Sequence, residues 1–231
     1  VYTLTYSPDS TPWTKGWDIR SSFLQKIPVF GTKHELFPPL ASTAWRQFDF
    51  SEFDLVISVT SAEAKALNVP KNVFHVCYCL TPTRYYWSGY FEYLEQAKKG
   101  RWGFAVSTIF KLFAHLLRVE DYNSGQKPNV MIGISDEVCQ RIKKYYRRDS
   151  TKIYPPVSSS VENQGDKFCL PDCKPYFLVV SRLVPYKHVD LVVEAFNRLG
   201  FNLVIVGTGS ELSSLKRIAK PNIHFVGFVD E

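Results

Sequence analysis

The sequence predicts an α/β fold built from two doubly wound parallel sheets, and three observations support this. Short apolar runs, rich in β-branched and aromatic residues, alternate with helical periodicity along the chain. Most runs are apolar on both faces, as parallel strands covered by helices on each side require. A polar, breaker-rich stretch after Pro155 and Pro156 divides the alternation in two. Alternation of this kind is typical of doubly wound sheets.

The elements follow in order. Strands are predicted over residues 1–6, 54–60, 73–79, 130–134, 152–154, 176–181, 202–206 and 223–226. Helices are predicted over residues 135–148, 187–199 and 210–219, and Ser135 or Asp136 is a plausible N-cap for the first of them.

The breaker-rich stretch predicts a domain junction. We expect an N-terminal domain over residues 1–156, a linker over 157–175, and the start of a C-terminal domain over 176–231. The chain opens at Val1 without a methionine, inside a predicted strand, and stops just after another strand. We therefore expect a longer parent chain, with both domains incomplete.

Composition excludes several classes of protein. A 45% apolar content is enough for a real core, and no apolar run approaches the roughly 20 residues that span a bilayer. Five cysteines are an odd number without a regular framework, which favours a reducing, cytoplasmic compartment. Cys77 with Cys79, and Cys169 with Cys173, lack a nearby histidine to complete a zinc set, so no metal site is expected.

The charge is uneven. Residues 1–155 hold 20 Lys and Arg against 14 Asp and Glu, whereas residues 156–231 hold 8 of each kind. This asymmetry suggests that the first part faces an anionic partner, either a phosphorylated substrate or a lipid surface.

The most informative segment surrounds Arg182 and Lys187. A predicted buried strand ends at Ser181, Arg182 lies in the following loop, and Lys187 is expected in the first turn of the next helix. Ligands of open α/β sheets bind at the carboxyl ends of strands, beside helix N-termini. An Arg fork and a Lys point charge there would suit a diphosphate. The plainer alternative is a pair of solvated surface charges.

The next predicted strand enters a glycine turn. Gly207 and Gly209 would let the backbone approach a nucleotide closely, but any tight strand-to-helix turn also favours glycine. Both interpretations stay open.

A second candidate site follows the strand at residues 73–79. Thr81, Arg84 and Trp87 lie just past its carboxyl end, where Arg84 could meet a phosphate and Trp87 could stack on a sugar. The alternative is a capped helix start at Pro82, with the aromatic residues packed as core.

Residues 181–187, with the helix and glycine turn that follow, resemble the donor-binding half of the family 4 (group 1) retaining glycosyltransferases. Residues 53–58, 75–87 and 142–156 resemble the bacterial mannosyltransferase-like members that build O-antigen and exopolysaccharide. The resemblance implies a GT-B fold of two Rossmann-like domains. It also implies that Arg182 and Lys187 are the catalytic contacts to the diphosphate of a nucleotide sugar, with GDP-mannose favoured and with neither a metal nor another cofactor.

The resemblance further implies a polyprenyl-diphosphate-linked or other glycan acceptor, Thr81, Arg84 and Trp87 on the acceptor side, and a cytoplasmic enzyme. Residues 101–118 are rich in Phe and Leu with basic residues at intervals, and could rest on the anionic inner face of the plasma membrane. A core helix is the alternative.

This sequence departs from the family in places. Related sequences often carry histidines where this one has Leu80 and residues 60–65, so Glu63 and Lys65 are either substitute polar contacts or an ordinary charge pair. A glycine-rich loop and a Glu-x7-Glu motif are absent from the 231 residues, and we expect this chain alone to lack turnover.

Two other functions compete. A basic nucleic-acid-binding module is suggested by the pI near 9.0 and by residues 143–148, but it leaves the neutral second half unexplained, and no nucleic acid is expected. An epimerase or a phosphorylase would share the fold and differ in chemistry.

Overall fold

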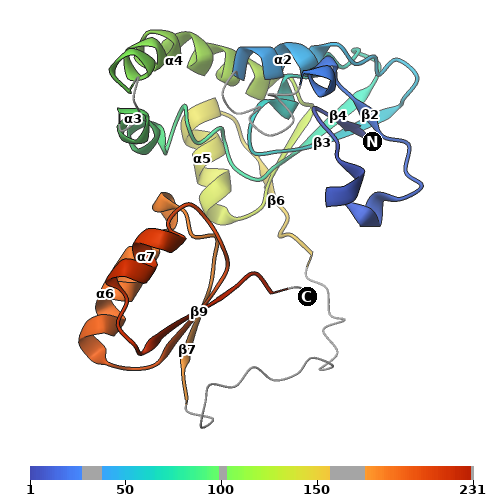
Figure 1. The fold of residues 1–231 in the computed structure, drawn as a ribbon. Helices are drawn as coiled ribbons and strands as arrows, with labels where there is room; N and C mark the ends of the chain where they lie inside the picture. The colour runs from blue at the N-terminus through green and yellow to red at the C-terminus, as the bar shows by residue number, and fades with distance from the viewer. Residues whose placement is uncertain (28–37, 99–102, 157–174, 230–231) are drawn as a thin grey trace. The chain divides into compact units, whose positions relative to one another are not determined.

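The computed structural model describes residues 1–27, 38–98, 103–156 and 175–229, in two compact units, Val1–Val157 and Ser158–Glu231 (Figure 1). Each unit contains a parallel sheet with helices, so the predicted α/β class is confirmed. The predicted linker, apart from Pro175, lies outside the described residues, as do Cys169 and Cys173.

The first unit is organised by a four-stranded parallel sheet of order β3-β4-β5-β6. The strands are β3 (Leu55–Thr60), β4 (Phe74–Cys79), β5 (Val130–Gly133) and β6 (Thr151–Lys152). All four carboxyl ends therefore meet at one edge, which is where the loops after β3 and β4 begin.

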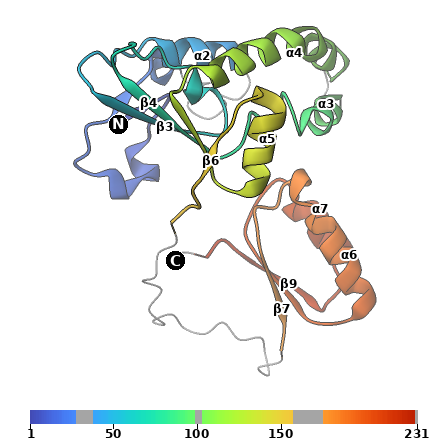
Figure 2. The same ribbon diagram turned by 180° about the vertical axis from the view of Figure 1, so that it is seen from behind.

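Helices α2 (Pro38–Arg46), α3 (Tyr90–Lys98), α4 (Gly103–Gln126) and α5 (Asp136–Tyr146) complete this unit. The long α4 and α2 lie along the same outer side of it (Figures 1 and 2). Ser135 caps α5 by accepting a hydrogen bond from the backbone N–H of Val138, as predicted. The helix ends at Arg147, which adopts a left-handed conformation.

Among the described residues, one face of this sheet is covered and the other is open to solvent. Cys77, Met131 and Ile142 are almost fully buried where α5 packs on the sheet. On the other face the side chains of Ile57 and Val59 are 61% and 60% exposed to solvent. The prediction that helices cover both faces is therefore wrong for the described part of the first unit.

The predicted strand over residues 1–6 is mostly wrong. Only β1 (Tyr2–Thr3) is extended, and it pairs in parallel with β2 (Arg20–Ser21). Side chains satisfy the backbone beyond it, because the Ser22 hydroxyl donates to the carbonyl of Leu4 and Gln25 bonds both the N–H and the carbonyl of Tyr6. These side-chain bonds replace the ladder bonds that a longer strand would need.

The chain between and after these short strands forms three 3-10 turns, namely η1 (Pro8–Ser10), η2 (Pro12–Thr14) and η3 (Phe23–Lys26). Proline opens the first two, where its fixed φ suits the first position and its missing N–H costs nothing.

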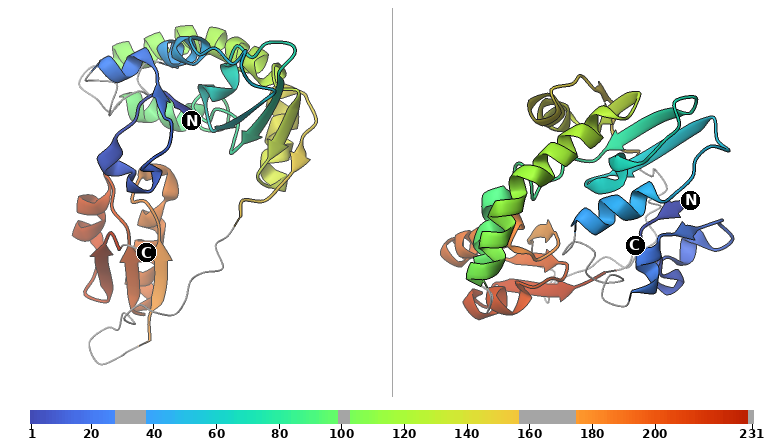
Figure 3. Two further views of the ribbon diagram at one scale, coloured as in Figure 1. Left: turned by 90° about the vertical axis from the view of Figure 1, so that its right-hand side faces the viewer. Right: turned by 90° about the horizontal axis from the view of Figure 1, so that it is seen from above.

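The second unit has a three-stranded parallel sheet of order β7-β8-β9 (Figure 3). Its elements are β7 (Phe177–Val180), α6 (Val189–Leu199), β8 (Leu203–Val206), α7 (Leu212–Ile218) and β9 (Ile223–Gly227). Leu183, Val193, Ile205 and Leu215 form its fully buried core. Each such apolar side chain contributes about 1.5–3 kcal/mol by leaving water.

Candidate functional site

The carboxyl ends of β7 and β8 form the first candidate site. Backbone pairing continues past both strands, because Ser181 N–H donates to the Val206 carbonyl at 3.0 Å and Leu183 N–H to the Thr208 carbonyl at 2.9 Å. Leu183 is fully buried, and its carbonyl accepts from Glu211 N–H at 2.9 Å. Arg182 therefore stands between two residues whose backbone is fixed.

Gly207 and Gly209 are required by this close backbone approach. A Cβ at residue 207 would lie 2.0 Å from the Ser181 carbonyl oxygen, and one at residue 209 would lie 2.1 Å from that of Leu183. Gly207 also has a φ of +132°, which disfavours any other residue. The turn thus has a structural need for glycine, and contact with a nucleotide stays a prediction.

Arg182 and Lys187 are both exposed, and within the described ranges neither side chain has a hydrogen bond or an ion pair. The Lys187 ammonium lies 5.7 Å from the centre of the Tyr186 ring, a cation–π contact. Two exposed cations therefore lie on one short loop at the edge of the sheet where ligands of such sheets bind.

Lys187 does not lie in the first turn of α6, as the sequence suggested. It ends a separate 3-10 turn, η7 (Pro185–Lys187), and α6 begins at Val189. The difference arises at His188, which takes a left-handed conformation with φ of 49° and breaks the helical path. No side chain caps α6, so its first N–H groups face the same loop without a side-chain partner.

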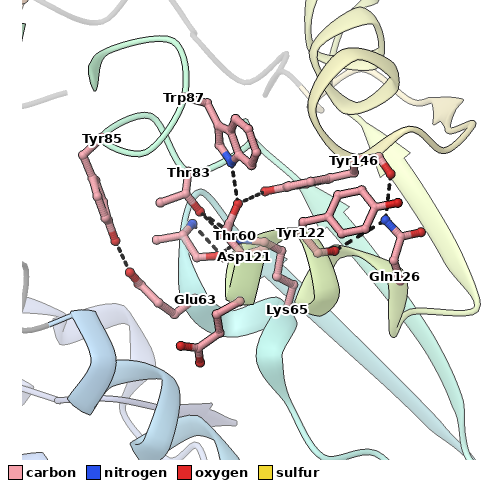
Figure 4. A network of polar contacts seen from close by, with 12 residues as sticks. Thr60, Glu63, Lys65, Thr83, Tyr85, Trp87, Asp121, Tyr122, Gln126 and Tyr146 are labelled. Carbon is pink, nitrogen blue, oxygen red and sulfur yellow. Dashed lines mark hydrogen bonds and ion pairs between the residues drawn. The ribbon is translucent and has the colours of Figure 1, made fainter. Parts of the chain in front are cut away.

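In the first unit, the loop after β4 leads into a buried polar network centred on Asp121 of α4 (Figure 4). One carboxylate oxygen accepts from the Thr83 hydroxyl at 2.6 Å and the Lys65 ammonium at 2.7 Å. The other accepts from the Trp87 indole N–H at 2.7 Å and the Tyr146 hydroxyl at 2.9 Å. Asp121 thereby joins four segments that are distant in sequence.

Lys65 belongs to this network and cannot reach solvent. Its side chain is 1% exposed and donates to the Thr83 hydroxyl at 2.9 Å and to the Ala62 carbonyl. Burial alone would lower the pKa of Lys65, but Tyr146 and Asp121 outweigh it and hold that pKa above its ordinary value. The surroundings of Lys65 do not suit a substitute polar contact, because Asp121 neutralises its charge inside the unit.

Glu63 lies at the edge of the same network and accepts a hydrogen bond from the Tyr85 hydroxyl (Figure 4). Burial raises the pKa of the Glu63 carboxyl, while Tyr85 and Lys65 partly oppose that shift. Glu63 and Tyr85 thus tie the turn after β3 to the loop after β4.

The three residues predicted for the acceptor side have different surroundings. Trp87 donates to Asp121 and stacks on Tyr145 with ring centres 5.0 Å apart, so the core interpretation describes its contacts. Arg84 lies 3.5 Å from the carboxylate of Glu92. The Thr81 hydroxyl is buried without a hydrogen-bond partner among the described residues. Their roles toward an acceptor stay predictions.

The basic run 143–148 is used only in part inside the unit. Lys143 pairs with Asp149 at 2.5 Å, and Tyr146 is fully buried. Arg148 donates to the carbonyls of Gly125 and Pro128, at 2.8 Å and 3.0 Å, and so caps the end of α4. Lys144 and Arg147 are exposed and have no ion pair among the described residues, so the run keeps part of its positive charge at the surface.

Of the stretch 101–118 singled out for a membrane surface, residues 103–118 lie in α4, and Arg101 and Trp102 lie outside the described residues. The outward side of α4 is apolar, with Phe104 86% exposed and Leu112 70% exposed, and with Phe113, Leu116 and Val119 also exposed. Within the described ranges, no helix is both long enough and apolar enough to cross a bilayer. The same ranges hold no cluster of three metal-ligating side chains.

Sequence reasoning missed Asp121, although a signal for it existed. Ser107, Ala114 and Asp121 recur at intervals of seven along α4 and are all buried, so they mark its inward side. A carboxylate on the inward side of an apolar helix needs a buried partner, which Lys65 supplies.

Comparison with known proteins gives a family for part of the chain. Residues 160–231 match the family described as "Glycosyl transferases group 1". The matched segment contains Arg182, Lys187, Gly207 and Gly209 and covers the described second unit. No curated protein matches the chain.

Two solved structures show a distant likeness. One is S. aureus TarM, a mutant in complex with Fondaparinux, alpha-GlcNAc-glycerol and UDP, at 13% identity and a TM-score of 0.42 over 70% of this chain. The other is the glycotransferase of kitacinnamycin, at 16% identity and a TM-score of 0.43 over 96% of this chain. The chain spans 30% of the first and 62% of the second. At these scores the two likenesses carry no argument about a site or a substrate.

Proposed function

We propose that this chain carries the donor-binding part of a glycosyltransferase that uses a nucleotide-diphosphate sugar. The observation that supports it most is the position of Arg182 and Lys187. Both are exposed in one loop at the carboxyl end of β7, inside the segment that matches the group 1 glycosyl transferases. The uncapped N-terminus of α6 adds a partial positive charge beside them.

These two residues suit the chemistry of glycosyl transfer. The bond between the anomeric carbon and the diphosphate oxygen breaks, and its electron pair moves onto that oxygen. The acceptor hydroxyl oxygen forms the new bond to carbon and its proton passes to the departing diphosphate. Arg182 and Lys187, aimed at the departing diphosphate, stabilise the charge that develops in the transition state and supply it without a metal ion. Gly207 and Gly209 let the turn after β8 come close to the nucleotide.

The finer assignment follows the resemblance of residues 53–58, 75–87 and 142–156. It takes the donor sugar to be a hexose, with mannose from GDP-mannose favoured, and the transfer to retain the anomeric configuration. It takes the acceptor to be a polyprenyl-diphosphate-linked or other glycan in bacterial surface polysaccharide synthesis. Thr81 and Arg84 are the acceptor-side candidates in the first unit.

Calorimetric titration of the 231-residue chain with GDP-mannose, UDP-glucose, GDP and UDP tests the donor site. We expect binding of at least one nucleotide sugar that weakens about 10- to 100-fold in each of Arg182→Ala and Lys187→Ala, because a hydrogen bond to a charged group contributes about 1.5–3 kcal/mol. Arg198→Ala and Lys216→Ala, which remove exposed basic side chains elsewhere in the second unit, are matched controls. Equal losses in the controls would show a general charge effect and contradict the proposal.

Product analysis distinguishes the competing functions. A transferase yields a lengthened acceptor and a free nucleoside diphosphate, an epimerase yields an isomeric nucleotide sugar, and a phosphorylase yields a sugar phosphate. Salt-dependent binding of random RNA or DNA, without binding of any nucleotide sugar, would favour the nucleic-acid module instead.

The proposal includes peripheral attachment to an anionic leaflet through α4, at the inner face of the plasma membrane. Phe104, Leu112 and Leu116 on its outward side are exposed, and Lys111 lies among them. Sedimentation with phosphatidylglycerol vesicles tests it. We expect Leu112→Gln with Leu116→Gln to reduce vesicle binding several-fold, while Leu191→Gln, on an exposed position of the second unit, leaves it unchanged. No binding by the unchanged chain would remove the membrane from the proposal.

A further inference from the structure

The loop between β1 and β2 presents two tryptophans to solvent. Trp13 is 70% exposed and Trp17 is 56% exposed. Exposed indoles at such levels are uncommon, since tryptophan is highly buried on average. Neither ring belongs to the network around Asp121, which contains Trp87, the aromatic residue singled out from the sequence.

The loop that carries them is tightly built. Thr14 lies between the two tryptophans and is buried, and its hydroxyl donates to the Thr11 carbonyl at 2.7 Å and lies 2.9 Å from the Tyr6 hydroxyl. The Trp17 N–H donates to the Thr14 carbonyl at 3.0 Å, which closes a tight turn with Gly16 at φ of +88°. Trp13 thus directly precedes this turn and Trp17 ends it.

The base of the loop is fixed as well. Gln25 accepts from the Tyr6 N–H at 2.6 Å and donates to the Tyr6 carbonyl at 3.1 Å. A loop held at its base and at its buried threonine has a fixed backbone at the two tryptophans before any ligand arrives. Such preorganisation reduces the entropy that binding would otherwise cost.

The charges around the two rings favour an uncharged ligand over an anionic one. Residues 7–19 contain Asp9, Lys15 and Asp18, a formal charge of −1. Asp18 is well exposed, although it pairs with Arg20 at 3.2 Å. Exposed carboxylates beside the indoles disfavour an anionic lipid surface, a nucleic acid or a diphosphate as the partner.

We infer that the loop of residues 7–19 is a stacking platform for the uncharged sugar rings of the glycan acceptor. The apolar C–H face of a pyranose packs on an indole, and the hydroxyl and carboxylate groups of Ser10 and Asp9 are hydrogen-bonding partners of the kind that sugar hydroxyls need. The identification of this sugar as the acceptor rests on the proposed transferase function, whereas the sugar binding itself does not.

Fluorescence titration and saturation-transfer NMR of the 231-residue chain with mannotriose, maltotriose and chitotriose test the inference. We expect at least one trisaccharide to change the tryptophan emission of the unchanged chain. The combined variant Trp13→Ala with Trp17→Ala should bind that trisaccharide at least about tenfold more weakly, a loss of about 1.4 kcal/mol, because it removes both rings on which the sugar packs. Phe104→Ala, which removes another highly exposed ring, is the matched control and should bind normally.

The readouts separate this inference from the donor site. The double tryptophan variant should keep its affinity for nucleoside diphosphates, and Arg182→Ala should keep its affinity for the trisaccharide. If the trisaccharide binds while Arg182→Ala leaves nucleotide binding unchanged, the transferase proposal fails and the platform stands. The platform is overturned if no trisaccharide binds the unchanged chain or if the double variant binds it equally well. It is also overturned if the tryptophans support only vesicle binding or self-association, as sedimentation would show.

Discussion

The loop after β4 and the loop after β7 follow parallel strands in the same way, yet they use their polar side chains in opposite ways. In the first, Thr83 and Trp87 bond to a buried carboxylate. In the second, Arg182 and Lys187 are exposed and the loop is held mainly by backbone bonds, to which the Ser181 hydroxyl adds one bond to the Arg182 carbonyl at 3.2 Å. A loop fixed through its side chains has few left for a ligand, whereas a loop fixed through its backbone leaves its side chains available.

Among the variants that test this contrast, removal of the Asp121 carboxylate should cause the largest loss of stability. Asp121→Ala leaves the Lys65 ammonium buried without its partner, which costs about 3–5 kcal/mol of unfolding free energy. Urea unfolding followed by tryptophan emission measures it, because all five tryptophans lie in the first unit. Glu120→Gln, which breaks a half-exposed pair with Arg46, is the control and should cost no more than about 1 kcal/mol. Equal effects would show that the network does not hold the loop.

A side chain at residue 209 should disturb the backbone clamp of the loop after β7, that is, the hydrogen bonds that join Leu183 to Thr208 and Glu211. In Gly209→Ala the new Cβ would lie 2.1 Å from the Leu183 carbonyl oxygen, so the loop must move. We expect a loss of about 2–3 kcal/mol in the second unit, measured as faster hydrogen exchange of the β7 and β8 amides. Gly200→Ala, where the φ is positive but space is open, should cost about 1 kcal/mol. Unchanged exchange in Gly209→Ala would contradict the clamp.

Acid should destabilise the first unit through the buried side chain of His75. His75 is buried beside Ser58, and burial, together with Lys127 and Arg148, lowers the pKa of His75 to about 4. The unfolded chain takes up this proton below its ordinary pKa of about 6.5, so the stability contributed by the neutral ring is lost as the pH falls from about 6.5 to 4. We expect a loss of about 2 kcal/mol over that range, and a flatter pH profile in His75→Gln. Parallel profiles for the two proteins would assign the loss to other groups.

Arg182→Ala should have the smallest effect on stability, although its effect on nucleotide binding should be large. Arg182→Ala removes an exposed side chain without a described partner, so the free energy of unfolding should change by less than about 0.5 kcal/mol. Thermal unfolding compared with nucleotide titration checks both parts. A destabilised Arg182→Ala would mean that the guanidinium serves the fold, and the contrast between the two loops would be lost.

Much of the fold could be predicted from local pattern. β3, β4, β5, β7, β8 and β9 lie within a residue or two of the predicted strands, and the Ser135 cap was foreseen. Apolar alternation and capping act over a few residues, so the sequence displays them directly. The short β1 and the delayed start of α6 were missed, because Gln25 and the backbone of His188 decide them.

The candidate site residues also fall into two groups, those that the local sequence places and those whose surroundings depend on long-range packing. The sequence by itself determined that Arg182 and Lys187 fall just after a strand, since that depends on neighbours in the chain. Only the tertiary structure decided that Lys65 is buried and that Trp87 is tied to Asp121, because those partners lie 56 and 34 residues apart in sequence. Only the tertiary structure also left Trp13 and Trp17 exposed around a buried threonine. A polar or aromatic side chain has the same local pattern whether it meets a buried partner or water, and long-range packing decides which it meets.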